Sequence, residues 1–175
     1  IATTATKIDK SNPSWVQNAA GLWHSIDYGY GKINALKMIE TCRSKYYKNL
    51  PSLEIKSTMI SNINAPISDT NVTMTTKVNF TDNMKVEWVG LTIDTDHPFA
   101  GDLEISLVSP QGTKVSIMTL TETHFAAYED GFRFGSVAFV DEDSAGVWSV
   151  EITDRLEDDS GMLKSVNLEV YGHKL

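Results

Sequence analysis

Clustered carboxylates are the side chains of this sequence best suited to chemistry. Asp94 and Asp96 stand two residues apart, residues 154–159 hold a second group, and residues 141–143 hold a third. Calcium takes about six to eight oxygen ligands, which carboxylates and backbone carbonyls in turns supply. The pattern therefore favours calcium as a cofactor. The predicted ligands are Asp94, Asp96, Asp102, Asp154, Asp158 and Asp159.

The same residues also fit an acidic, solubilising surface whose aspartates cap turns, since Asp accepts hydrogen bonds from nearby backbone N–H groups. From residue 94 to residue 161 there are fifteen Asp and Glu against three Lys and Arg. No EF-hand loop is present. Both interpretations of the carboxylates stay open at this point. Zinc is not expected, because no Cys/His spacing supports it.

Nucleophilic hydrolysis needs a base within hydrogen-bond reach of the nucleophile and a group that orients the base. The sequence has no Gly-Thr-Ser motif, and its only cysteine, Cys42, stands in a helical pattern where we expect it to be buried. The histidines are expected to be structural or surface residues. They are His24, His97, His124 and His173. We therefore predict that this chain does not hydrolyse peptides.

Net charge and hydropathy exclude two classes of partner. The formal net charge of -8 and the pI of about 4.9 would repel phosphate backbones, so nucleic-acid binding is not expected. Apolar runs are only a few residues long, too short to span a bilayer. The chain begins at Ile1 rather than Met, and we expect it to be part of a longer protein.

Period-two patterns predict a mainly β fold with a helical N-terminal extension. One helix is expected over residues 34–46, with Asn34 as its N-cap, and Pro51 follows its end. A change of phase predicts a β-bulge near Trp88 to Gly90, and residues 62–71 are expected to be a surface connection. Eight strands suit a two-sheet jelly-roll β-sandwich. The predicted strands are 53–60, 72–80, 84–93, 103–108, 114–120, 136–140, 147–153 and 165–171.

Five short motifs occur in a fixed order between Asp94 and Tyr171. They are Gly101-Asp102-Leu103-Glu104-Ile105, Ser109-Pro110-Gln111-Gly112-Thr113, Gly146-Val147-Trp148, Asp159-Ser160-Gly161-Met162-Leu163 and Leu168-Glu169-Val170-Tyr171-Gly172. In this order they resemble the P domain, or homo B domain, of kexin- and furin-like proprotein convertases and their bacterial relatives. The resemblance implies a jelly-roll domain over residues 48–175 that packs on a protease catalytic domain and stabilises it.

A second resemblance covers the beginning of the chain. The octet from Tyr28 to Ala35, with Trp23-His24 before it, resembles the end of the catalytic domain of subtilisin-like proteases. It implies that residues 1–47 are a C-terminal remnant of such a domain and that the catalytic domain of the same parent chain is the partner. The expected domain-interface residues are Tyr28, Tyr30, Leu36 and Ile39. Alone, we expect this region to be poorly anchored and its apolar stripe to favour self-association.

These resemblances imply a secreted or extracellular serine endopeptidase as the parent protein, or a periplasmic one if it is bacterial and not exported further. The alternative is a stand-alone jelly-roll module that binds a carbohydrate or a protein. Carbohydrate-binding jelly rolls expose aromatic side chains, whereas the four tryptophans are expected in the core or at a domain interface. They are Trp15, Trp23, Trp88 and Trp148. The octet and its helix favour the protease interpretation, since a lectin-like module has no use for them.

Overall fold

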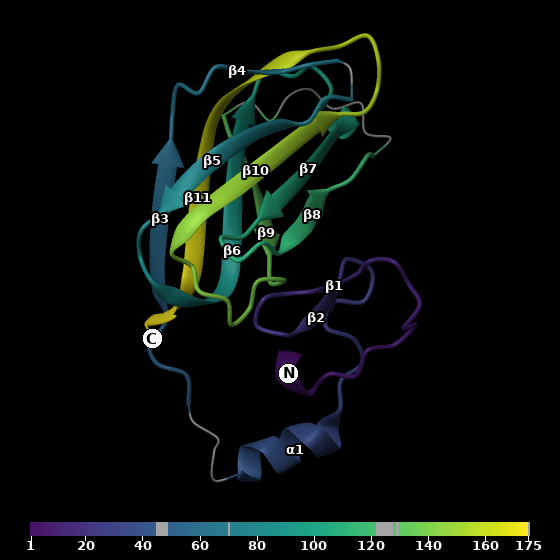
Figure 1. The fold of residues 1–175 in the computed structure, drawn as a ribbon, viewed down its shortest axis with the longest axis vertical. Helices are drawn as coiled ribbons and strands as arrows, with labels where there is room; N and C mark the ends of the chain where they lie inside the picture. Colours follow the sequence, from purple (N-terminus) through teal and green to yellow (C-terminus); the bar gives the residue numbers. More distant parts are fainter. Residues whose placement is uncertain (45–48, 70, 122–127, 129, 175) are drawn as a thin grey trace.

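The computed structural model describes residues 1–44, 49–69, 71–121, 128 and 130–174. Figure 1 shows a β-sandwich with a smaller N-terminal segment against one of its ends, and this segment includes helix α1. "N-terminal segment" here means residues 1–44, and "sandwich" means the strands from residue 54 onward. In the described part of the chain, no helix has the length and hydrophobicity needed to cross a membrane.

Two antiparallel sheets form the sandwich, which confirms the predicted mainly β, two-sheet architecture. The four-stranded sheet has the order β5 (Met74–Phe80), β10 (Gly146–Asp154), β7 (Leu103–Val108) and β8 (Lys114–Met118). The five-stranded sheet has the order β3 (Glu54–Ile60), β11 (Gly161–Lys174), β6 (Met84–Thr95) and β9 (Phe132–Ser136), and β4 (Ala65–Ile67) pairs with β11. A short 3-10 helix, η2 (Ala100–Asp102), leads into β7.

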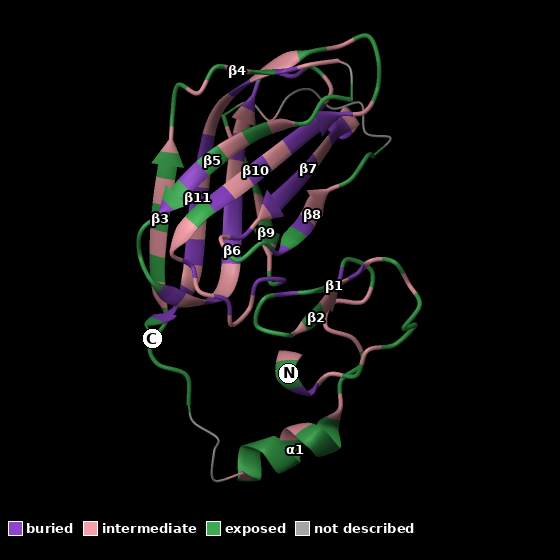
Figure 2. Ribbon diagram, viewed as in Figure 1, coloured by how far each residue is buried: buried purple, intermediate pink, exposed green. Residues whose placement is uncertain are grey.

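The core lies between the sheets, where alternate side chains of every long strand point inward. Figure 2 shows this alternation as buried and less buried residues along the strands. In β6, Val86 is buried in one phase, while Val89 and Leu91 are buried in the other. The pairing of β6 with β11 skips Glu87, because Tyr171 pairs with Trp88 and Gly172 with Val86. The predicted β-bulge therefore exists, immediately before Trp88.

The N-terminal segment contains little regular structure. Its elements are a 3-10 helix η1 (Ala2–Thr4), the paired strands β1 (Trp15–Gln17) and β2 (Trp23–Ser25), and helix α1 (Ala35–Arg43). The Asn34 side chain accepts a hydrogen bond from Lys37 N, as predicted for the N-cap. The predicted last residue of the helix, Tyr46, lies outside the described residues.

Cys42 is exposed, so the prediction that it is buried was wrong. The helical pattern around it was read correctly, but α1 has no buried residue, because its contact with η1 leaves most of its surface exposed (Figure 2).

The predicted strand at residues 136–140 and the predicted surface connection at residues 62–71 were also wrong. Residues 136–140 are not a strand, because β9 ends at Ser136 and a turn follows. The apolar run there is buried for another reason, since Phe139 packs edge-on against Trp148 with ring centroids 5.1 Å apart. The supposed surface connection of residues 62–71 contains strand β4, whose Ile67 is part of the core.

Trp148 is fully buried near the start of β10, and its indole N–H donates to Ser144 O at 2.8 Å. Replacing Trp148 by Ala removes a large buried ring and its contact with Phe139. We expect the free energy of unfolding to fall by about 3–5 kcal/mol. Urea denaturation of the wild-type and Trp148→Ala chains measures this. A loss below about 1 kcal/mol would contradict the core position.

Candidate docking interface

Asn18 joins the N-terminal segment to the sandwich through its side-chain amide. Its Nδ2 donates to Ala138 O at 3.0 Å and to Val140 O at 2.9 Å, while its Oδ1 accepts from Leu22 N. Asn18 is buried, and the two carbonyls belong to the turn that follows β9. A buried carbonyl without a donor is costly, so this amide satisfies the turn and fixes the loop between β1 and β2 upon it.

Glu142 forms a second buried contact beside Asn18. Its Oε1 accepts from Ala19 N at 2.9 Å and from the Thr113 hydroxyl at 2.5 Å. Thr113 Oγ1 in turn accepts from Ala19 N at 3.0 Å. The Glu142 side chain is only 1% exposed, and its Oε2 has no hydrogen-bond partner. A carboxylate, a hydroxyl and a backbone amide from three parts of the chain therefore meet at one point.

Tyr30 makes the third polar contact, because its hydroxyl donates to Val137 O. Burial is the main cause that raises the pKa of Tyr30 to about 12, and the neighbouring carboxylates of Asp141 and Glu142 contribute to this rise. The hydroxyl therefore stays protonated and able to donate at neutral pH. Tyr30 was predicted as an interface residue, and the structure places it against the sandwich.

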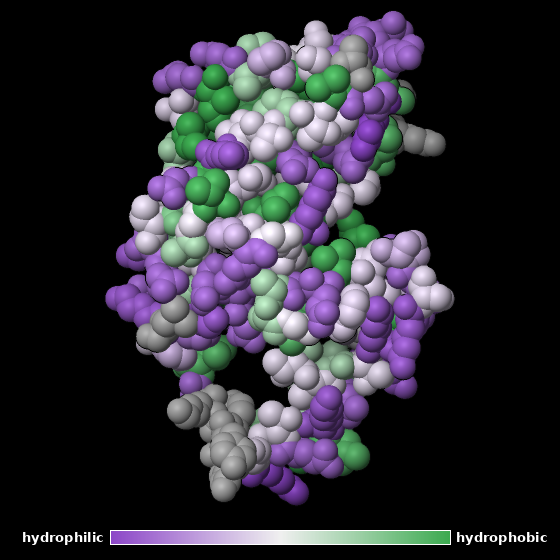
Figure 3. Space-filling model, viewed as in Figure 1, coloured by the Kyte–Doolittle hydropathy of each residue, from purple (hydrophilic) through white to green (hydrophobic). Residues whose placement is uncertain are grey.

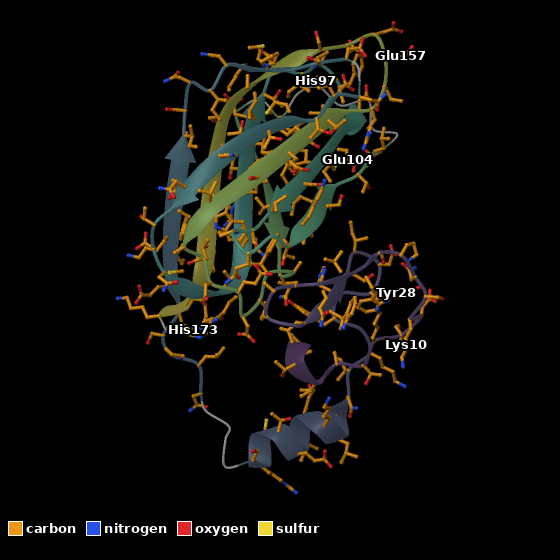
Figure 4. The ribbon with its side chains drawn as sticks, viewed as in Figure 1. Lys10, Tyr28, His97, Glu104, Glu157 and His173 are labelled. Atoms are coloured by element: carbon orange, nitrogen blue, oxygen red, sulfur yellow. The ribbon has the colours of Figure 1, made fainter. Side chains whose placement is uncertain are left out.

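The other predicted interface residues do not contact the sandwich. Tyr28 lies within the N-terminal segment (Figure 4), where its ring stacks on Trp15 and its hydroxyl donates to Asp9 at 3.0 Å, a bond that raises the pKa of Tyr28. Leu36 and Ile39 on α1 are 68% and 51% exposed. These three residues belong to surfaces that the described sandwich does not cover.

Glycine permits the local fold that presents Tyr30. Gly31 has a φ of +102°, and a Cβ there would lie 2.5 Å from Thr6 O. Thr6 and Lys32 exchange backbone hydrogen bonds across this close approach. Only glycine lets the chain fold back on residue 6 immediately after Tyr30.

Sequence reasoning missed Asn18, Thr113 and Glu142 as interface residues. Glu142 stood in the third acidic cluster, which was considered for calcium. No periodic signal marks Asn18, since its partners lie 120 and 122 residues further along the chain.

Residues 1–47 were expected to be poorly anchored, and the structure shows different anchoring in two parts of this region. The region around Asn18 and Tyr30 is held by buried contacts, whereas α1 is not.

The predicted calcium ligands lie at the opposite end of the molecule from Tyr28, as the position of His97 in Figure 4 shows. Asp154 is buried with His97, whose Nε2 lies 3.0 Å from Asp154 Oδ2, and Asp154 Oδ1 accepts from Leu156 N. Asp96 Oδ1 accepts from Met162 N at 2.7 Å. The backbone N–H of Asp158 donates to Asp69. These contacts are turn-capping and structural.

Metal coordination by the predicted set is not visible in this arrangement. Within the described ranges, no group of three or more His, Cys, Asp or Glu side chains could hold a metal ion. Asp94 and Asp102 flank the segment on either side of His97, and Asp159 follows Asp158.

The tryptophans do not form a sugar platform. Trp15 and Trp148 are buried, and Trp23 is partly exposed beneath Lys7, whose Nζ lies 3.7 Å from the ring centroid. Trp88 lies on the outer face of the five-stranded sheet, where the Arg133 guanidinium covers it at 4.6 Å. A flat aromatic surface for stacking a sugar ring is therefore not available at these four positions.

Part of the sandwich is similar to a known domain family. The family model described as "Proprotein convertase P-domain" matches residues 86–170. The matched part runs from the bulge in β6 into β11. It includes the first four of the five motifs described above and the first three residues of the fifth.

Three curated relatives are informative. Protease KEX1 of Kluyveromyces lactis is 26% identical over 98% of this chain and 24% of its own length. The Aeromonas extracellular serine protease of Aeromonas sobria is 29% identical over 83% of this chain and 26% of its length. The Calcium-dependent protease of Trichormus variabilis is 26% identical over 82% and 22%. This chain thus spans about a quarter of the length of each relative.

One solved structure covers nearly the whole chain. The crystal structure of the serine protease of Aeromonas sobria matches with a TM-score of 0.84 over 98% of this chain and 39% of that chain, at 24% sequence identity. At this identity the match supports the fold, including a placement of the N-terminal segment similar to the one described above.

Replacing Asn18 by Ala should loosen the N-terminal segment and leave the sandwich intact, because Ala138 O and Val140 O lose a shared donor in a buried place. We expect the docking free energy to fall by about 1–3 kcal/mol. Hydrogen exchange should then accelerate in residues 14–31 but not in β11. Asn79→Ala on the exposed face of β5 is the matched control. Unchanged exchange in residues 14–31 would contradict the anchoring role.

Raising the pH should also weaken docking. The docked Tyr30 has a pKa of about 12, whereas a released tyrosine has its ordinary value of 10.0, so the released form loses its proton first. The stabilisation is complete below pH 10 and is lost as the pH rises towards 12. Ultraviolet titration should show a phenolate transition near pH 12 that Tyr30→Phe removes and Tyr28→Phe leaves in place. Persistence of that transition in Tyr30→Phe would contradict the assignment.

Proposed function

We propose that this chain is the non-catalytic region of a secreted subtilisin/kexin-like serine endopeptidase, because residues 86–170 match the proprotein convertase P-domain model and the similar relatives are proteases. In this proposal, residues 48–175 are the P domain and residues 1–47 are the C-terminal remnant of the catalytic domain. The P domain packs on the catalytic domain, stabilises it and so supports proteolysis by the parent protein.

The distribution of exposed apolar side chains carries the proposal. Seven of the exposed large hydrophobic residues lie in the N-terminal segment, and five of these fall between residues 23 and 39. They are Trp23, Ile26, Ile33, Leu36 and Ile39. Figure 3 shows hydrophobic surface beside hydrophilic side chains in the region of α1. Apolar surface concentrated in this way is typical of an interaction site.

The partner that this surface fits best is the rest of a catalytic domain. The three relatives that align over this chain are about four times as long, and all three are named as proteases. The buried contacts of Asn18, Glu142 and Tyr30 would then fix the position of the sandwich relative to the catalytic domain. Because both parts belong to one chain, even a modest interface is well occupied.

Without the catalytic domain, the same apolar face would pair with a second copy of this chain. The name of the Aeromonas extracellular serine protease supports export of the parent protein to an extracellular or periplasmic location.

Beyond the carboxylate pattern, calcium is suggested by the name of one relative, the Calcium-dependent protease. The predicted ligands do not fit a calcium site as they are placed, since Asp154 is held by His97 and Asp96 by a backbone amide. Calcium binding to this chain therefore stays a sequence-based prediction. Thermal melts in calcium, in magnesium and in chelator are the measurements that check it.

The coding sequence before Ile1 tests the parentage, and a Gly-Thr-Ser motif a few tens of residues upstream is the expected result. In the full-length protein, deleting residues 48–175 should abolish secreted activity on a dibasic fluorogenic peptide. The Asn18→Ala variant should reduce this activity, because it weakens docking. Lys77→Ala, at an exposed position of β5, is the matched control.

The present chain alone should not turn over the dibasic peptide. Turnover that a serine-protease inhibitor abolishes would contradict the non-catalytic assignment, and full activity after deletion of residues 48–175 would contradict the stabilising role.

A further inference from the structure

A cavity of about 210 Å³ separates the N-terminal segment from the sandwich next to the polar contacts described above. His24 and Ile26 line it on one side, and Val115, Ile117 and Val137 line it on the other. The remaining wall is formed by hydroxyl groups and glycine backbone. Apart from His24, the described lining contains no ionisable side chain.

His24 lies at the centre of β2, where it pairs with Val16 of β1. Its ring meets the Tyr30 ring edge-on, with centroids 5.2 Å apart, and Tyr30 in turn is bonded to Val137 O. Among the residues that the structure describes, His24 has this ring contact but no hydrogen-bond or ion-pair partner. The imidazole therefore supports the docked Tyr30 through packing, as a neutral ring.

Charged groups on the surrounding elements are bound elsewhere. On β8, Lys114 pairs with Glu151 at 2.7 Å, and on β9, Arg133 pairs with Glu169 at 2.6 Å. In the turn after β9, Glu142 accepts from Ala19 and Thr113. Asp27 in the turn after β2 and Asp141 after β9 are outside the cavity lining. Tyr30 is the titratable group in contact with His24, and it stays neutral over the relevant range.

We propose that His24 makes the docking of the N-terminal segment on the sandwich sensitive to acid. A protonated imidazole would place a positive charge beside apolar walls with no carboxylate to pair with, which disfavours the docked arrangement. Release would carry the ring into water and would pull Tyr30 away from Val137. This acid-sensitive docking involves only residues of the present chain, so it does not depend on the proposed protease function.

The sign of the effect follows from burial, which lowers the pKa of His24 from its ordinary value of 6.5. The released segment regains the ordinary value and therefore binds a proton first as the pH falls. Docking is complete above pH 6.5 and weakens as the pH falls through the lowered value. Each unit by which burial lowers the pKa weakens docking about tenfold at acid pH.

Hydrogen exchange of the full chain at about pH 7.5 and about pH 5 tests this inference across the range in which histidine titrates. Rates are corrected for the intrinsic effect of pH, and β11 serves as the internal reference. Residues 14–31 should lose protection at the lower pH in the wild type. His24→Phe keeps an aromatic ring that cannot take a proton, so its protection should not change with pH. His173→Gln, which alters the distant pair with Glu87, should behave as the wild type does.

Equal loss of protection in the wild type and His24→Phe would overturn the inference, as would no loss in the wild type. If His24→Phe is released at both pH values, the NMR titration of the wild-type His24 ring decides the question. A midpoint below the ordinary histidine value of about 6.5 supports the inference, and a midpoint at or above it overturns it.

Discussion

The side-chain amide of Asn18 is the interaction on which the relative placement of the two parts of this molecule depends. The turn after β9 buries Phe139 beneath Trp148, and this leaves the neighbouring carbonyls of Ala138 and Val140 without partners in either sheet. Buried carbonyls need donors, and the sandwich does not supply them here. The N-terminal segment does, through one amide that bonds both carbonyls, so the end of the sandwich and the docked segment complete each other.

A polar interface of this kind differs from the core in what it stabilises. The core residues of the two sheets would collapse together in many related packings, because hydrophobic contact has little direction. The contacts of Asn18, Glu142 and Tyr30 have fixed geometry and hold one arrangement. Removing one partner leaves the other buried and unsatisfied, which makes the interface intolerant of single changes.

Much of the sandwich could be predicted from sequence, since seven of the predicted strands correspond to β3, β5, β6, β7, β8, β10 and β11. Inward-facing residues of a half-buried strand must alternate, and this alternation is visible without a structure. The pattern failed for residues 136–140, because a buried turn and a buried strand have the same apolar composition. It also missed β9, where Gly135 interrupts the alternation to make room for the Trp88 ring. The interface escaped prediction because a single asparagine with partners more than a hundred residues away produces no local pattern.

The predicted calcium ligands show the same limit of prediction from sequence. Composition drew attention to Asp154, but burial beside His97 gives this side chain a partner that no spacing rule reveals. The polar side chains at the two ends of the sandwich therefore have different roles. At the end of the sandwich far from the N-terminal segment, aspartates accept hydrogen bonds within turns. At the near end, which contacts the N-terminal segment, amide, carboxylate and phenol groups hold that segment in place. His24 belongs to the near end and packs there without a polar partner. The acid-sensitive group therefore lies where its charge would affect docking and leave the core untouched.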